Sequence, residues 1–130
     1  MAEGRMLKKK ISVSEQVADL ASDLNRLLFT WCIPHLDVEG RMCCSPRKFK
    51  GMVCPLLDHV GPKDVSEFLI DASRVGLVSV YAVGSDQYMQ VPGFDRNQTV
   101  RKDREAESTI PGPPQGTPGV VREWSGRTPG

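Results

Sequence analysis

The stretch Pro62–Phe94, PKDVSEFLIDASRVGLVSVYAVGSDQYMQVPGF, decides the fold that we expect. Its first half places apolar residues at helical spacing after a proline, which the first turn of a helix tolerates. Gly76 then provides a helix stop. Its second half holds two β-branched and aromatic runs, residues 77–83 and 87–91, joined by the turn sequence Gly-Ser-Asp. The stretch therefore predicts an amphipathic helix that leads directly into a β-hairpin.

Two further helices are expected near the start of the chain. Ser12, with a glutamate three residues later, forms a capping-box signal and predicts a short helix over residues 13–20. Ser22 or Asp23 can cap the next helix, which Pro34 should end or bend. The buried stripe of this second helix is predicted to be Leu24, Leu27, Leu28, Trp31 and Cys32.

A turn, a short strand and another helix are expected between these segments. Residues 37–41 have the composition of a turn, and residues 41–44 can form a short strand beside the hairpin. Ser45-Pro46 suits the N-cap and first position of a helix, which Pro55 should end early or kink. The inward residues of this helix are predicted to be Phe49, Met52, Val53 and Leu56.

The predicted order is helix, short strand, helix, turn, helix, strand, wing and strand. It indicates a mainly α fold with a small β-hairpin over residues 12–94, namely a winged helix-turn-helix with a three-helix core and a two- or three-stranded wing. Trp31 lies at helical spacing among leucines, so we interpret it as a core residue rather than a base-stacking one. The predicted core comprises Leu24, Leu28, Trp31, Phe49, Val53, Phe68, Leu69, Leu77 and Val80.

The two ends of the chain have different compositions from this domain. Residues 1–11 form a basic arm, which either frays in solvent or contacts a phosphate backbone. Residues 95–130 are first basic and then rich in proline and glycine, which predicts a disordered tail. No apolar run approaches the roughly 18 residues of a membrane span, and no signal-peptide pattern follows Met1. We therefore expect a soluble cytoplasmic protein with no membrane partner.

Metal and acid–base chemistry can be weighed from the cysteines and histidines. A zinc site would recruit Cys32, His35, Cys43 or Cys44, Cys54 and His59, but the spacing offers one C-x-x-H pair and no second knuckle. We therefore expect reduced cysteines that act as small buried apolar residues, and no cofactor. His35 and Asp37 lack an accompanying nucleophile, second carboxylate or phosphate-binding loop, so we expect no enzyme activity.

A set of short motifs from residue 5 to about 104 points to a known family. The motifs are Arg5-Met6-Leu7, Ser12, Ser14, residues 27–37 (LLFTWCIPHLD), Gly40-Arg41, residues 53–56 (VCPL), residues 75–78 (VGLV), Tyr81, Tyr88, residues 91–94 (VPGF) and Gln98. Their order resembles the opening of bacteriophage replisome-organiser proteins, winged-helix proteins related to primosomal DnaD and to phage replication initiators. The resemblance implies DNA binding, often at a phage origin in a bacterial host cell, and recruitment of the host helicase or its loader. Many relatives continue into a second helical domain, where this chain has its Gly/Pro-rich tail, so the resemblance covers the DNA-binding half.

The charge pattern gives a more specific expectation for the interface. The helix that begins at Pro62 is the third helix of the predicted three-helix core. It is expected to expose three carboxylates and two cations, in Lys63, Asp64, Ser66, Glu67, Asp71, Ser73 and Arg74. Such a surface is poor at contacting phosphates, so contacts to duplex DNA should come mainly from cations outside this helix. The candidate DNA-binding residues are Lys8, Lys9, Lys10, Arg41, Arg47, Lys48, Lys50, Lys63, Ser66, Arg74, Arg96 and Arg101.

Two other functions fit the same sequence. A winged helix can also serve as a transcriptional regulator, and a domain whose cations do not converge can be a protein-interaction module that does not bind DNA. The formal net charge of +1 does not separate these functions, because DNA-binding proteins are marked by a basic face rather than by a basic total.

Overall fold

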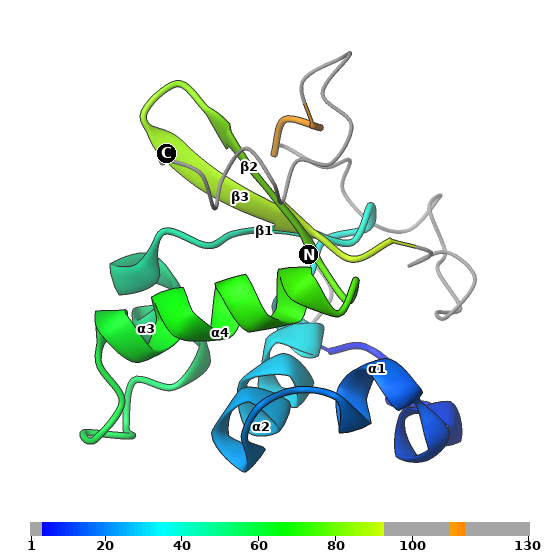
Figure 1. Ribbon diagram of the computed structural model, residues 1–130. Coiled ribbons are helices and arrows are strands. Elements are labelled where there is room, and N and C mark those ends of the chain that lie inside the picture. Colours follow the sequence, from blue (N-terminus) through cyan, green and yellow to red (C-terminus); the bar gives the residue numbers. More distant parts are fainter. Residues whose placement is uncertain (1–3, 93–109, 114–130) are drawn as a thin grey trace.

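The computed structural model describes residues 4–92 and 110–113 (Figure 1). In chain order its elements are the 3-10 helix η1 (Lys9–Val13), α1 (Glu15–Ala18), α2 (Asp23–Cys32), the 3-10 helix η2 (Ile33–His35), β1 (Arg41–Cys43), α3 (Pro46–Val53), α4 (Pro62–Arg74), β2 (Ser79–Val83) and β3 (Asp86–Gln90). This confirms the expected mixture of helices with a small antiparallel sheet. It also confirms the short strand predicted within residues 41–44, before the helix that begins at Pro46.

The sheet has three antiparallel strands in the order β1-β3-β2. Met42, Met89 and Val80 lie in one row across it, and all three are buried in the main apolar core. The hairpin between β2 and β3 turns tightly, because Val83 pairs with Asp86 and leaves two residues between them. Gly84 is the first of these and has a φ of +64°, a conformation that favours glycine.

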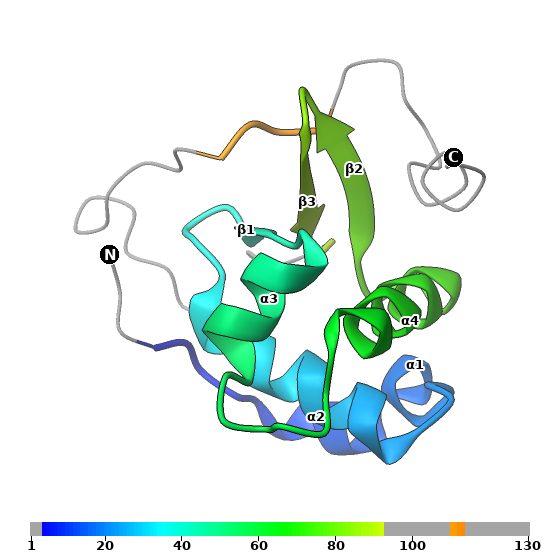
Figure 2. The ribbon, with the colours of Figure 1, turned by 90° about the vertical axis from the view of Figure 1, so that its left-hand side faces the viewer.

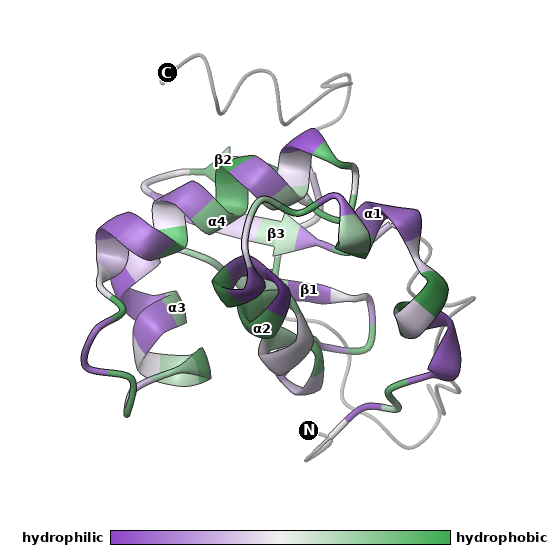
Figure 3. Ribbon diagram, turned by 60° about the horizontal axis from the view of Figure 1, so that its bottom comes forward, coloured by the Kyte–Doolittle hydropathy of each residue, from purple (hydrophilic) through white to green (hydrophobic). Residues whose placement is uncertain are grey.

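The helices α2, α3 and α4 all lie on one side of this sheet (Figures 1 and 2), and both α2 and α3 pack against α4. Hydrophilic and hydrophobic residues alternate along α3 and α4, as expected of helices with one buried face (Figure 3). The Phe49 and Phe68 rings join these two helices, with centroids 5.6 Å apart. Predicted core residues that are buried are Leu28, Phe49, Val53, Phe68, Leu69, Leu77 and Val80, while Leu24 is half-buried.

The prediction that Trp31 is a core residue is wrong. Its side chain is 41% exposed, and Phe29 is buried instead. The helix α2 is turned relative to the predicted stripe, because Asn25 is buried and its amide donates to Asp71 of α4. The prediction that Met52 and Leu56 point inward is also wrong: α3 ends at Val53, one residue before the turn, and both side chains are exposed.

The start of the chain differs from the prediction as well. Ser14, not Ser12, caps the first α-helix, since its hydroxyl accepts from the Val17 amide. The helix covers four residues, and the boundary placed after residue 11 falls inside η1. Arg26 of α2 explains the early stop, because its guanidinium donates to the carbonyls of Val17, Ala18 and Leu20 at the end of α1.

Residues 110–113 contact the sheet. The Tyr81 hydroxyl donates to the Pro111 carbonyl, and the Arg41 guanidinium donates to the Ile110 carbonyl. Composition alone does not reveal these two contacts, because their donors, Tyr81 and Arg41, lie far away in the chain. Residues 93–109 and 114–130, which contain most of the tail that is predicted to be disordered, lie outside the described residues. Within the described part, no helix combines the length and the apolar composition that crossing a membrane requires.

Candidate nucleic-acid interface

One side of the molecule brings together α3, the start of α4 and the tip of the hairpin, and Figure 2 looks onto it. Pro46 begins α3 and Pro62 begins α4. The ammonium of Lys48 lies 3.3 Å from the Asp86 carboxylate, which ties α3 to the hairpin. This contact raises the pKa of Lys48, first through the hydrogen bond to Asp86 and then through its charge. We call this side the α3–hairpin edge and define it by Arg47, Lys48, Lys63 and Asp86.

Two cations of the α3–hairpin edge point into solvent. Arg47 and Lys63 are exposed, and neither forms a hydrogen bond or ion pair with a residue that the structure describes. Ser66 lies one turn further along α4 and is half-buried. Arg47 and Lys63 are therefore the candidate residues best placed to contact an anion.

Lys50 has a structural role instead. Its ammonium donates to the Cys54 carbonyl and to the Leu57 carbonyl, each at 2.7 Å. These two bonds hold the turn that follows α3, and they use two of the three donors of the ammonium. Lys50 is thus a connector between α3 and α4 rather than a surface cation.

The acidic character expected of the third predicted helix is mostly absent from its surface. Asp71 and Ser73 are buried, which corrects the expectation that they are exposed. Asp64 turns back and accepts from the Gly61 amide at the start of the helix, at 2.8 Å. Glu67 remains exposed. Of the three carboxylates of α4, only Glu67 is therefore exposed.

Asp71 anchors α4 to the turn between α1 and α2. Its carboxylate accepts from the Ala21 amide at 2.7 Å, from the Asn25 side chain at 2.8 Å and from Arg74 at 2.6 Å. Burial alone would raise its pKa, but the hydrogen bonds from Ala21, Arg74 and Asn25 together hold the pKa of Asp71 below its usual value. Arg74 also donates to the Asp19 carbonyl. The guanidinium of Arg74, a candidate DNA contact, therefore forms hydrogen bonds within the domain.

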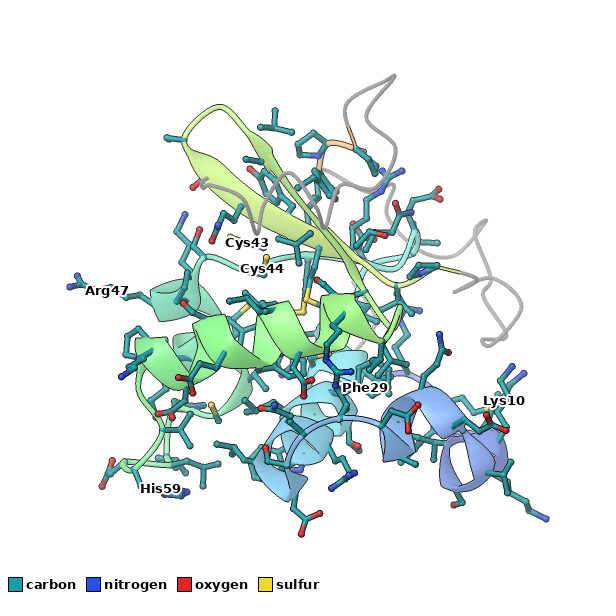
Figure 4. All side chains as sticks on the ribbon, viewed as in Figure 1. Lys10, Phe29, Cys43, Cys44, Arg47 and His59 are labelled. Carbon is teal, nitrogen blue, oxygen red and sulfur yellow. The ribbon has the colours of Figure 1, made fainter. Side chains whose placement is uncertain are left out.

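The remaining candidate cations lie elsewhere. Arg41 is half-buried on the sheet, where it donates to Ile110. Lys8 is half-buried before η1, and Lys9 and Lys10 are exposed within it. Lys10 and Arg47 lie on opposite sides of the molecule (Figure 4). The candidate cations therefore do not all lie on one side of the molecule. Arg96 and Arg101 lie outside the described residues.

The cysteines are thiols without disulfide bonds, three of them buried. Burial raises the pKa of Cys32 to about 12 and raises that of Cys44 further, so both stay protonated at neutral pH. His59 lies far from Cys43 and Cys44 (Figure 4). Among the residues that the structure describes, no group of three or more His, Cys, Asp or Glu is placed to hold a metal ion. Asp37 accepts from the amides of Glu39 and Arg41, which confirms its interpretation as a turn residue.

An apolar surface lies away from the α3–hairpin edge. Trp31, Leu7 and Val53 help to line an open pocket of about 370 Å³ between the N-terminal segment and α2. Met52 and Leu56 are also exposed, Leu56 to 89%. Sequence periodicity placed Trp31, Met52 and Leu56 inward and so missed this surface.

Comparison with family models, with curated proteins and with solved structures found no match. The candidate interface is therefore defined by the geometry and charge of this chain's own residues.

Proposed function

We propose that this domain is a winged helix that binds duplex DNA through the α3–hairpin edge. The observation that carries the proposal is the junction of three elements. The helix α4 precedes the hairpin directly, the strand order is β1-β3-β2, and Lys48 and Asp86 join α3 to the hairpin. In a winged helix these three elements correspond to the helix-turn-helix pair and the wing, which meet DNA from one side.

The charges on this edge support a weak and sequence-tolerant contact. Arg47 and Lys63 offer two exposed cations, and Lys48 can add a third by exchanging Asp86 for a phosphate. Each phosphate contact changes the slope of log affinity against log salt by about −0.9. Two or three contacts therefore give a slope of about −2 to −3, far less than that of strongly basic DNA-binding proteins.

The resemblance to phage replisome organisers supports a role in replication initiation. That role requires a candidate origin fragment to bind more tightly than random duplex of the same length. Equal affinity for the two duplexes would still support DNA binding without sequence preference, but it would contradict origin recognition.

A pair of matched variants tests the DNA-binding proposal. Arg47→Ala with Lys63→Ala and Lys9→Ala with Lys10→Ala each remove two exposed cations, but from opposite sides of the molecule. Fluorescence anisotropy with a labelled duplex at about 50 mM salt keeps the electrostatic attraction strong. We expect the first pair to weaken binding about tenfold and to flatten the salt slope by about 1.8, and the second to change affinity less than twofold.

The opposite pattern would place the DNA contact on the N-terminal arm. An absence of binding to both random and origin duplex under these conditions would remove DNA binding altogether. The apolar surface around Trp31 and Leu7 would then favour the second candidate, a protein-interaction module, because exposed apolar patches mark contact sites.

A further inference from the structure

The face of the sheet that points away from the helices carries its own set of residues. The row Met42–Met89–Val80 points into the core, so the two flanking rows point outward. These rows are Arg41–Gln90–Ser79 and Cys43–Tyr88–Tyr81. We call them the outer sheet face.

Tyr81 is buried on this outer face. Its side chain is 1% exposed, yet it does not belong to the main apolar core. Burial raises its pKa to about 12, and the Tyr88 ring lies beside it with a centroid distance of 5.9 Å. The helices lie on the opposite face of the sheet. Another segment of the chain must therefore cover the Tyr81 side chain on this face.

Residues 110–113, Ile-Pro-Gly-Pro, supply that partner, and they lie beside the hairpin in Figures 1 and 2. The Tyr81 hydroxyl donates to the Pro111 carbonyl at 2.5 Å, and Arg41 Nη1 donates to the Ile110 carbonyl at 3.3 Å. Two consecutive main-chain carbonyls are therefore recognised by two side chains of the sheet.

Gly112 fits the same arrangement for a steric reason. A Cβ atom at this position would lie 3.0 Å from Arg41 Nη2 and 3.3 Å from Arg41 Cζ. Such distances are tighter than ordinary contacts, so the guanidinium would have to move by a few tenths of an ångström to admit a side chain here. Glycine at this position fits beside Arg41 without that shift.

We propose that the outer sheet face is a binding site for extended peptides of the type aliphatic–Pro–Gly–Pro, and that residues 110–113 occupy it in cis. An aromatic surface with donors for prolyl-segment carbonyls is how other domains recognise proline-rich segments, whose stiffness lowers the entropy lost on binding. The tail contains related triplets, Thr117-Pro118-Gly119 and Thr128-Pro129-Gly130. Neither Arg47 nor Lys63 belongs to this site, so the test of this proposal is independent of the test of DNA binding.

The test uses the full chain with the cis segment disabled by Ile110→Ser, Pro111→Ser and Pro113→Ser. A labelled peptide of residues 107–115, ESTIPGPPQ, is titrated with this variant and with the unaltered chain. The tethered segment competes at an effective concentration of about millimolar, so we expect the variant to bind the peptide at least about tenfold more tightly. Adding Tyr81→Phe should weaken its binding about five- to tenfold, through loss of one hydrogen bond. A matched peptide with alanine in place of Gly112 should bind more weakly than the original.

Equal binding by the two chains, with no effect of Tyr81→Phe, would overturn the proposal. Nitration of tyrosine, mapped by mass spectrometry, gives a second measurement that does not depend on peptide affinity. Tyr81 should be protected in the unaltered chain and reactive in the disabled variant, with Tyr88 as internal reference and circular dichroism to verify the fold. Protection of Tyr81 in both folded chains would show that another segment covers it, and would equally overturn the proposal.

Discussion

The charged side chains at the two ends of α4 have different surroundings. At its N-terminal end Lys63 and Glu67 are exposed to solvent. At its C-terminal end Asp71 and Arg74 are tied to the α1–α2 turn through Ala21, Asn25 and Asp19. A charged residue on an amphipathic helix is therefore a surface group or a buried anchor according to what packs beside it, and the helix's own sequence does not reveal which.

The largest expected difference between the two ends is in stability. Asp71→Ala leaves the Ala21 amide and the Asn25 side chain without their acceptor and Arg74 without its carboxylate partner. We expect a loss of about 3–5 kcal/mol in the free energy of unfolding, as for removal of one partner from a buried charged pair. Glu67→Ala, the matched exposed carboxylate, should change it by less than about 0.5 kcal/mol. Urea denaturation measures both, and equal losses would refute the distinction.

A smaller effect is expected at the glycine that follows α4. Gly76 has a φ of +84°, and a Cβ there would lie 3.0 Å from the Gln16 side chain. Gly76→Ala should therefore destabilise the domain by about 1–2 kcal/mol. Gly51 inside α3 has open space around it, so Gly51→Ala should stabilise by about 0.5–1 kcal/mol. Thermal denaturation should show a lower midpoint for Gly76→Ala and a higher midpoint for Gly51→Ala. Midpoints that shift in the same direction would contradict the expectation.

The smallest effect is expected in acid. Because the pKa of Asp71 is lowered in the folded state, its ionised form contributes stability that is fully present above the unfolded value of about 3.9. That contribution is lost as the pH falls through the folded value. The advantage of the unaltered chain over Asp71→Asn should therefore be constant between about pH 5 and 7 and shrink below about pH 4. Urea midpoints at pH 7, 5 and 3 measure it, and an advantage that persists undiminished at pH 3 would contradict the assignment.

Local signals were sufficient for the hairpin and for α4. Pro62, the spacing of apolar residues, and Gly76 all act within a few residues of each other, and the structure begins and ends the helix where they indicate. The same holds for the tight turn at Gly84. Such features depend on backbone geometry that a residue imposes on its own neighbourhood.

Long-range partners account for what the sequence did not reveal. Asp71 accepts hydrogen bonds from Ala21 and Asn25, about fifty positions earlier, and these two contacts turn α2 so that Phe29 rather than Trp31 is buried. Periodicity gives the width of an apolar stripe but not its angle to the rest of the fold. The contacts of residues 110–113 were missed for the same reason, because they depend on donors from two strands far away in the chain.

The pairing of β1 with β3 has a consequence for the order of folding. Arg41 and Gln90, which pair across these strands, are 49 positions apart, and α3, α4 and β2 lie within the loop that they close. The β2–β3 hairpin and the α3–α4 pair have short connections, so we expect them to form early, whereas β1 docks last because its loop-closure entropy is largest. By the same reasoning β1 should be the first strand to detach in the native ensemble, and its amides should exchange with solvent faster than those of β2.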